Sequence, residues 1–187
     1  MSSPSILTVS SDMAMSVEQA QAETLEFVPS VKRGDRIMYD SVNPYAIPRD
    51  AKVVAGYFDG GSYSWSEEQF RMFEHAEHLH IDRTANRADD CGVLDIENGT
   101  VGPGVAREWC ESRRKLYGDH ARRILYCNLS TWPAVRQAVA GLSGHKYWIA
   151  NPTGYLHGLS GAVAVQCQWP SIGSPGQYDV SLVTGDI

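Results

Sequence analysis

Eight short apolar runs recur along the chain from residue 36 onward, and they constrain the fold more than any other feature of the sequence. The runs are rich in β-branched and aromatic residues, which favour strands. Their hydrophobicity is continuous rather than alternating, as in Lys52–Tyr57, and this is typical of strands covered on both faces in a parallel sheet or barrel. The eight predicted strands span residues 37–39, 52–58, 79–81, 92–96, 123–127, 147–150, 162–167 and 178–183.

Helical patterns separate several of these runs. Ser64 and Glu67 have the spacing of a capping box, which predicts a helix that continues to about residue 78. Apolar residues on one side predict a second helix over residues 105–117 and a third over about 131–144. Alternating strands and helices indicate an α/β fold.

The connections after the first, sixth and seventh runs are too short, or too rich in Pro and Gly, for full crossover helices. We therefore expect a small, irregular TIM-like (β/α) barrel. An open doubly wound sheet would also fit the same alternation of elements and remains the alternative at this point.

The first part of the chain differs in character from the rest. Residues 1–34 are rich in Ser, Glu, Gln and Ala and poor in aromatics, a composition that favours an N-terminal arm over a core. Residues 35–187 would then form the barrel domain. Apolar residues of the arm fall on one side of a helix, so it could be an assembly segment with a surface to cover, or else a frayed tail.

Bulk composition excludes some classes of binding partner. A net charge of -6 argues against nucleic acid as a ligand, because affinity for nucleic acid depends on clustered Lys and Arg. Residues 1–15 lack a basic start followed by an apolar core, and no stretch of about 18 apolar residues occurs. We expect no signal peptide and no membrane partner, so the chain would be cytoplasmic on synthesis or a component of a phage virion.

Cysteine and histidine usage gives no sign of metal chemistry. No Cys-x-x-Cys pair occurs, and the four cysteines lie in or beside apolar segments, where we expect reduced core residues. Three histidines between residues 75 and 80 resemble a metal site, but a helix that gives way to a strand would disperse them. We expect neither a metal nor a cofactor. The cysteines are Cys91, Cys110, Cys127 and Cys167.

The sharpest chemical motif is the strand end at Asp95 and Glu97. Positions i and i+2 of a strand point to the same face, so both carboxyls can converge on one bond of a substrate. Crowding and burial raise the pKa of at least one of them, and one acid can then hold a proton while the other stays ionised. Glycosidic bond cleavage requires this division of labour. A lone Asp-x-Glu also occurs at solvated strand ends, which is the alternative for this motif.

Further acids accompany other predicted strands. Asp40 ends the first run, Tyr57 and Asp59 end the second, and Asp179 lies in the last. The carboxyl ends of parallel strands gather at one face of a barrel, so these side chains would meet Asp95 and Glu97 there. Unpaired carboxylates repel one another, and their convergence favours a functional explanation.

The order of these motifs resembles the family 25 glycoside hydrolases, lysozymes that cut bacterial peptidoglycan. The chain is most similar to short proteins related to that family in actinobacteria and their phages, and the resemblance covers about residues 36–183. The motifs that carry it are Asp40, Leu94–Glu97, Tyr126–Trp132, Tyr147–Ala150, Ala164–Gln166 and Tyr178–Val180.

The resemblance implies roles for individual residues. Glu97 would be the general acid, and Asp95 would stabilise the transition state or position the acetamido group of the substrate. Asp40 and Asp179 would complete an acidic floor. The resemblance also implies a metal-free reaction. The implied substrate-binding residues are Tyr57, Asp59, Tyr126, Trp148 and Gln166, with the aromatics as flat faces for sugar rings or as ordinary barrel packing.

Two functions follow as hypotheses. The first is a lysozyme-like hydrolase, with the glycan of the bacterial cell wall as its partner. The second is a phage virion protein, in the tail or as a capsid accessory, that retains the barrel as a scaffold or glycan-binding module. In that case residues 1–34 would contact virion partners or further copies of the chain.

Overall fold

The computed structural model describes residues 27–28 and 31–187, and eight of the strands in this part of the chain close into a barrel. Each barrel strand coincides with one predicted run, so the prediction of eight strands is confirmed. The strands are β2 (Arg36–Asp40), β3 (Val53–Tyr57), β4 (Glu77–Asp82), β5 (Val93–Ile96), β6 (Ile124–Asn128), β7 (Lys146–Ala150), β9 (Ala164–Gln168) and β10 (Asp179–Val183).

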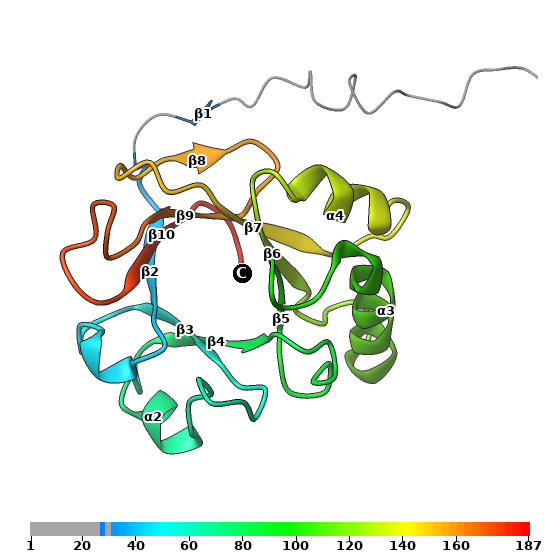
Figure 1. Ribbon diagram of the computed structural model, residues 1–187, viewed down its shortest axis with the longest axis horizontal. Helices are drawn as coiled ribbons and strands as arrows, with labels where there is room; N and C mark the ends of the chain where they lie inside the picture. The colour runs from blue at the N-terminus through cyan, green and yellow to red at the C-terminus, as the bar shows by residue number, and fades with distance from the viewer. Residues whose placement is uncertain (1–26, 29–30) are drawn as a thin grey trace, which may run out of the picture.

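Strand order around the barrel is β10-β2-β3-β4-β5-β6-β7-β9 (Figure 1). The seven strands from β2 to β9 pair in parallel, and β10 pairs antiparallel with both of its neighbours. The predicted irregular (β/α) barrel is therefore confirmed, and the open doubly wound sheet is excluded. The antiparallel β10 departs from a regular (β/α) barrel, because only a short excursion separates β9 from β10 and a parallel return needs a longer crossover.

Helices cover the outside of the barrel: α2 (Glu67–Arg71), α3 (Ala106–Tyr117) and α4 (Trp132–Ala138) (Figure 1). Two short 3-10 turns, η1 (Pro44–Ala46) and η2 (Pro103–Val105), lie in the connections. The α3 helix ends as predicted, at Gly118, whose φ of 77° is accessible to glycine without steric cost.

Two of the predicted helices are too long. The capping box at the start of α2 joins Ser66 and Gln69 rather than Ser64 and Glu67. This helix stops at Arg71, because β4 begins at Glu77 and must supply apolar side chains to the barrel interior. The α4 helix stops at Ala138, and the chain continues in turns rather than in helix to residue 144.

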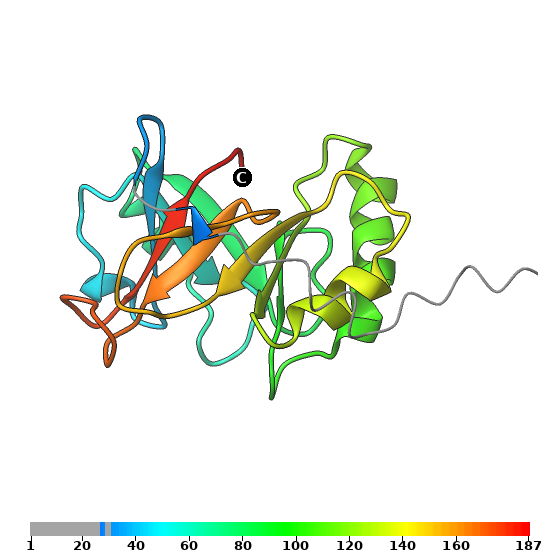
Figure 2. The ribbon, with the colours of Figure 1, turned by 90° about the horizontal axis from the view of Figure 1, so that it is seen from above.

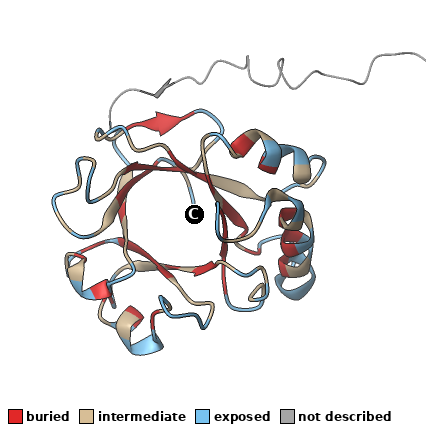
Figure 3. Cartoon of the chain, in the orientation of Figure 1, coloured by how far each residue is buried: buried red, intermediate tan, exposed pale blue. Residues whose placement is uncertain are grey.

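Alternation along the strands divides the apolar side chains into an inner and an outer set. The inner set fills the barrel and includes Met38, Val53, Leu79, Ile124 and Trp148. The outer sets pack beneath α3 and α4 on one side and beneath α2 on the other. Figure 3 shows these strands buried nearly all around the ring, so both faces are covered, as their continuous hydrophobicity predicts.

The end of the chain closes one mouth of the barrel. Residues 184–187 follow β10 to the end at which the parallel strands begin, and the terminus lies near the barrel axis (Figures 1 and 2). Ile187 packs against the inner core, and Lys146 Nζ donates to the Asp186 carbonyl oxygen at 2.7 Å. The opposite mouth, where the parallel strands end, is the one that carries the predicted site.

A two-stranded sheet outside the barrel has no counterpart in the predicted elements. Its strands are β1 (Phe27–Val28) and β8 (Gly158–Leu159), which pair antiparallel. Residues 27–28 therefore contact the barrel domain through their backbone. The predicted arm over residues 1–34 and its possible helix otherwise fall mainly outside the described residues.

Two further predictions from composition concern the cysteines and membrane-spanning helices. All four cysteines are buried and unpaired, in agreement with the prediction that they are core residues. Within residues 27–28 and 31–187, no helix has the length and apolar character needed to cross a bilayer.

Candidate active site

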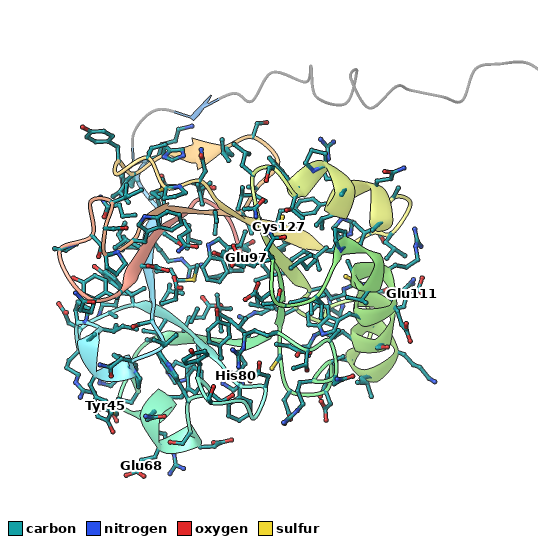
Figure 4. The ribbon with its side chains drawn as sticks, in the orientation of Figure 1. Tyr45, Glu68, His80, Glu97, Glu111 and Cys127 are labelled. Carbon is teal, nitrogen blue, oxygen red and sulfur yellow. The ribbon has the colours of Figure 1, made fainter. Side chains whose placement is uncertain are left out.

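The carboxyl ends of the parallel strands bring most of the predicted site residues together. Asp95 and Glu97 lie at the end of β5, with side chains on the inner face that β5 shares with Val93. Figure 4 shows Glu97 within the ring of strands, whereas Glu68 and Glu111 lie on the outer helices. Two tyrosines and a glutamine lie beside the acids of this mouth.

Asp40 and Asp179 are direct neighbours across the β2–β10 ladder. Asp40 ends a parallel strand as predicted, but Asp179 reaches the same mouth for a different reason, because it begins the antiparallel β10. Gln166 Nε2 donates to Asp179 Oδ2 at 2.6 Å, and the Tyr126 hydroxyl donates to the Gln166 side-chain oxygen. Asp179, Gln166 and Tyr126 thus form a hydrogen-bonded row along one side of the mouth.

Asp95 is the most buried carboxyl of the four, with 1% of its surface exposed. The Tyr57 hydroxyl donates to its Oδ2 at 3.3 Å, and Thr100 Oγ1 lies 3.5 Å from its Oδ1. Burial and the nearby charge of Glu97 raise the pKa of Asp95 to about 7, against the lowering effect of the Tyr57 hydrogen bond. This carboxyl therefore changes its ionisation near neutral pH.

Glu97 is half-buried and stands above Asp95 at the mouth. A turn fixes its backbone, since Thr100 Oγ1 accepts from the Glu97 amide at 2.8 Å and Thr100 N donates to the Glu97 carbonyl at 3.1 Å. Burial raises its pKa, and the nearby Tyr126 hydroxyl acts in the opposite direction. Of the two acids on β5, Glu97 is the one that an incoming substrate can reach.

The other pair of acids is also perturbed. Burial, followed by the charges of Asp179, Asp95 and Glu97, holds the pKa of Asp40 well above its usual range. Its Oδ1 is buried and has no hydrogen-bond partner among the described residues. Burial and the charge of Glu97 raise the pKa of Asp179 to about 6. Four carboxyls thus compete for protons in one small volume.

The tyrosines of the site stay protonated. Burial, followed by the charges of the surrounding carboxylates, raises the pKa of both Tyr57 and Tyr126 well above the ordinary tyrosine value. Their hydroxyls are therefore fixed hydrogen-bond donors, to Asp95 and to Gln166 respectively. Such donors hold the orientation of the groups that they contact.

Asp59 is not brought into the group of four acids. Its side chain is fully buried and is bound by Arg83, with Arg83 Nε at 2.7 Å from Oδ2 and Nη2 at 3.2 Å from Oδ1. The Gly61 amide and the Ser64 hydroxyl also donate to Oδ1. Although burial opposes it, these hydrogen bonds hold the pKa of Asp59 well below its usual range. Its oxygens are occupied, so it orients Arg83 rather than a ligand.

Arg83 is a site residue that the sequence analysis missed. Its guanidinium lies over the Tyr57 ring, 4.5 Å from the centroid, and 5.2 Å from the centroid of Tyr63. Its charge lowers the pKa of Asp95. A lone arginine after a strand carries no sequence signal of this kind, although its place just beyond the third apolar run could have drawn attention to it.

Trp148 does not offer a face to a ligand. Only 1% of its surface is exposed, and its Nε1 donates to Ser181 Oγ at 3.0 Å. One edge meets Tyr126, with ring centroids 4.6 Å apart. The expected sugar-binding role is therefore corrected to packing, since Trp148 lies one layer below the mouth in the barrel interior.

The mouth encloses a small cavity of about 70 Å³. It lies between Asp40, Tyr57 and Asp179, and Ser41, Ala55 and Ile81 also line it. Among the described residues, no three His, Cys, Asp or Glu side chains are arranged to hold a metal ion. The chemistry available here is that of carboxyl groups with separated protonation states and fixed phenol donors, which suits proton transfer.

Fold and site together define a class: an irregular β/α barrel with the fold of the family 25 glycosyl hydrolases and paired acids at its open mouth. A family 25 glycosyl hydrolase from Bacillus anthracis superposes with a TM-score of 0.50 and 14% sequence identity, covering 86% of this chain and 94% of that one. A glycosyl hydrolase 25 of Streptococcus pneumoniae, described as a virulence factor in host cell invasion, gives a TM-score of 0.49 and 11% identity, covering 79% and 86%. Neither a protein-family model nor a curated protein matches the sequence.

Proposed function

We propose that the protein is a lysozyme-like glycoside hydrolase that cleaves the glycan of bacterial peptidoglycan. One observation carries the proposal: Asp40, Asp95, Glu97 and Asp179 gather at one mouth of a barrel with the fold of a family 25 glycosyl hydrolase, and all four have raised pKa values. Perturbed acids that converge in this way are typical of sites for acid–base chemistry.

In the proposed reaction Glu97 is the general acid. It is the acid of β5 nearer to solvent, so it can protonate the oxygen of the leaving sugar as the glycosidic bond breaks. Asp95 lies behind it and, when ionised, stabilises the positive charge that develops on the sugar ring or holds the substrate acetamido group. Asp40 and Asp179 form the floor, and buried Gln166 holds Asp179. Tyr57 and Tyr126 hold Asp95 and Gln166 and contact the sugar. No metal or cofactor takes part.

The test is digestion of purified peptidoglycan with the full chain. Mass analysis of the soluble products should show glycan fragments, with new reducing ends whose identity reveals the bond that is cut. Release of peptide fragments without new reducing ends would contradict the proposal, because it would assign the cut to an amide bond. Unchanged walls at every pH tested would contradict it as well.

The pH dependence follows from the Asp95 and Glu97 pair. Catalysis requires the pair to hold one proton, and the last proton leaves near the pKa of Asp95, about 7. We expect the rate to fall roughly tenfold per pH unit above about pH 7. It should also fall at acidic pH, where both acids are protonated. Initial rates of wall clearing across the pH range measure this profile, and a rate that still rises above pH 8 would contradict it.

Arg83 should set the position of the alkaline limb, which is the part of the pH–rate profile where the rate falls as the pH rises. Its charge lowers the pKa of Asp95, so Arg83→Gln should raise that pKa and move the limb to higher pH. Arg83→Lys keeps the positive charge and serves as the matched control, with a limb close to that of the wild type. If Arg83 only supported the loop through Asp59, both variants would change the rate at all pH values and leave the limb in place.

A second candidate is a phage virion protein that retains the barrel as a scaffold or glycan-binding module. One observation favours it: the cavity of about 70 Å³ is well below the ~300–1,000 Å³ of ordinary ligand sites. Chains lacking residues 1–34 separate the two candidates. Loss of self-assembly, with no wall cleavage by either the full or the shortened chain, would favour the scaffold. An actinobacterial or phage setting fits both candidates.

A further inference from the structure

A tight turn follows the two acids of β5 and returns the chain to them. Thr100 N donates to the Glu97 carbonyl at 3.1 Å. Gly99, which lies between them, has a φ of 94°, a conformation that glycine adopts without steric cost. The turn brings Thr100 Oγ1 to 3.0 Å from the carbonyl oxygen of Asp95. The side chain of Thr100 therefore lies against both acids, although it follows them in the chain.

The Thr100 hydroxyl has more acceptors within reach than it can serve. Its Oγ1 accepts from the Glu97 amide at 2.8 Å. Near its own proton lie the carbonyl oxygens of Asp95 and Glu97, both at 3.0 Å, and Asp95 Oδ1 at 3.5 Å. A hydroxyl has one proton to donate, so it serves one of these three acceptors at a time.

The charge of Asp95 sets which acceptor is favoured. The Glu97 carbonyl already accepts from the Thr100 amide, so it does not depend on the hydroxyl. A neutral Asp95 carboxyl competes weakly for the proton at 3.5 Å, whereas a carboxylate forms a charge-assisted hydrogen bond that is roughly twice as strong as a neutral one. Ionisation of Asp95 should therefore rotate the hydroxyl toward Oδ1 and shorten that contact.

Tyr57 provides the matching donor on the other oxygen of the same carboxyl. Its hydroxyl donates to Asp95 Oδ2 at 3.3 Å, so each oxygen of Asp95 has one hydroxyl within reach. Tyr57 belongs to β3, whereas Thr100 belongs to the turn that also holds Glu97. Thr100 thus links the ionisation of one acid to the backbone of the other. The further titratable or charged groups around Asp95 are Asp40 of β2, Arg83 beyond β4, Glu97 of β5, and Tyr126 and Cys127 of β6.

We propose that Thr100 is the positioning residue of the acid pair: its hydroxyl fixes the Glu97 backbone and turns to Asp95 Oδ1 when that carboxyl ionises. The catalytic part of this inference rests on the proposed hydrolase function. The ionised Asp95 is then held between two hydroxyl donors, in one orientation behind Glu97. Without the Thr100 hydroxyl, the Glu97 amide loses its acceptor in the turn and the Asp95 carboxylate loses one of its two donors.

The test compares Thr100→Val, which keeps the shape of the side chain but neither donates nor accepts, with Thr100→Ser, which keeps the hydroxyl. In Thr100→Val the pKa of Asp95 should rise by roughly one pH unit, because its carboxylate loses a hydrogen bond. Carbon-13 NMR of protein labelled at the aspartate carboxyl carbons measures this pKa, and the Asp95 signal is identified by its absence in Asp95→Asn.

Hydrolysis of peptidoglycan gives the second reading. Thr100→Val should lower kcat by about 10–100-fold with little change in KM, and its alkaline limb should move to higher pH. Thr100→Ser should restore the pKa of Asp95, the rate and the limb. Thr184→Val is the matched control, because it removes an exposed hydroxyl just beyond the end of β10, at the opposite end of the barrel. It should match the wild type in both readings.

Two results would overturn the proposal: an Asp95 carboxyl that titrates at the same pH in Thr100→Val and in the wild type, or a Thr100→Ser variant as impaired as Thr100→Val. The melting temperature verifies that each variant is folded, and Thr100→Ala gives the same reading if valine strains the turn. The NMR titration needs no substrate. A wild type that cleaves no glycan would therefore contradict the hydrolase function, while the pKa of Asp95 in these variants still tests the role of Thr100.

Discussion

Glu97→Gln should reduce the hydrolysis of purified peptidoglycan by about 10²–10⁴-fold. The substitution keeps the shape of the side chain, but it removes the proton that the leaving sugar must receive. The folded state should change little, because Glu97 is half-buried and its backbone is held by Thr100. Reducing ends released per unit time measure the loss, and the melting temperature verifies the fold.

Glu68→Gln and Glu111→Gln are the matched controls for this variant. Both glutamates lie on the outer helices, away from the mouth (Figure 4), so each substitution makes the same chemical change outside the proposed site. Both controls should clear walls at the rate of the wild type. Equal clearing by the Glu97→Gln variant would reject the role of Glu97 as the general acid.

Asp82→Ala should destabilise the protein by at least about 3 kcal/mol. Asp82 ends β4 and is completely buried, and its carboxylate accepts four hydrogen bonds. The donors are Thr84 N and Oγ1 and Arg87 N, each at 2.8 Å, and Trp109 Nε1 at 3.2 Å. Alanine leaves these donors without a partner and removes the hydrogen bond from Trp109 of α3, one of those that hold α3 beside the loop over residues 83–91.

Urea denaturation of the wild type and the variant measures this loss, which corresponds to a drop in melting temperature of roughly 6–12 °C. Asp89→Ala is the matched control, because Asp89 lies on the same loop with 61% of its side chain exposed. It should change the free energy of unfolding by less than about 0.5 kcal/mol. Equal stabilities of the Asp82→Ala variant and the wild type would show that the loop does not depend on this carboxylate.

The barrel could be predicted from the sequence because most of its strands are covered on both faces. Continuous apolar runs mark such strands, and all eight were identified. Helix ends were less predictable, since the helix that begins at Glu67 is cut short by the need of β4 for side chains such as Leu79 in the core. Local capping preferences carry no information about that competition.

The site could be predicted only in part. Strand alternation places Asp95 and Glu97 on one face whatever the surroundings, so that pair was found. Asp59 does not join the other acids because it binds Arg83, a partner 24 residues away. No local pattern in the sequence reveals that contact. Trp148 was predicted to bind the substrate because a continuous apolar run does not show how deep in the barrel each residue lies.

The antiparallel closure of the barrel has a consequence for how the protein is made. Asp40 and Asp179 meet only when β10 pairs with β2, so the acidic floor joins nearly the first and the last strands to be synthesised. A nascent chain that does not yet include β10 lacks this seam, and contacts so distant in sequence form slowly. The protein therefore brings its full set of acids together only after β10 has been synthesised and has paired with β2.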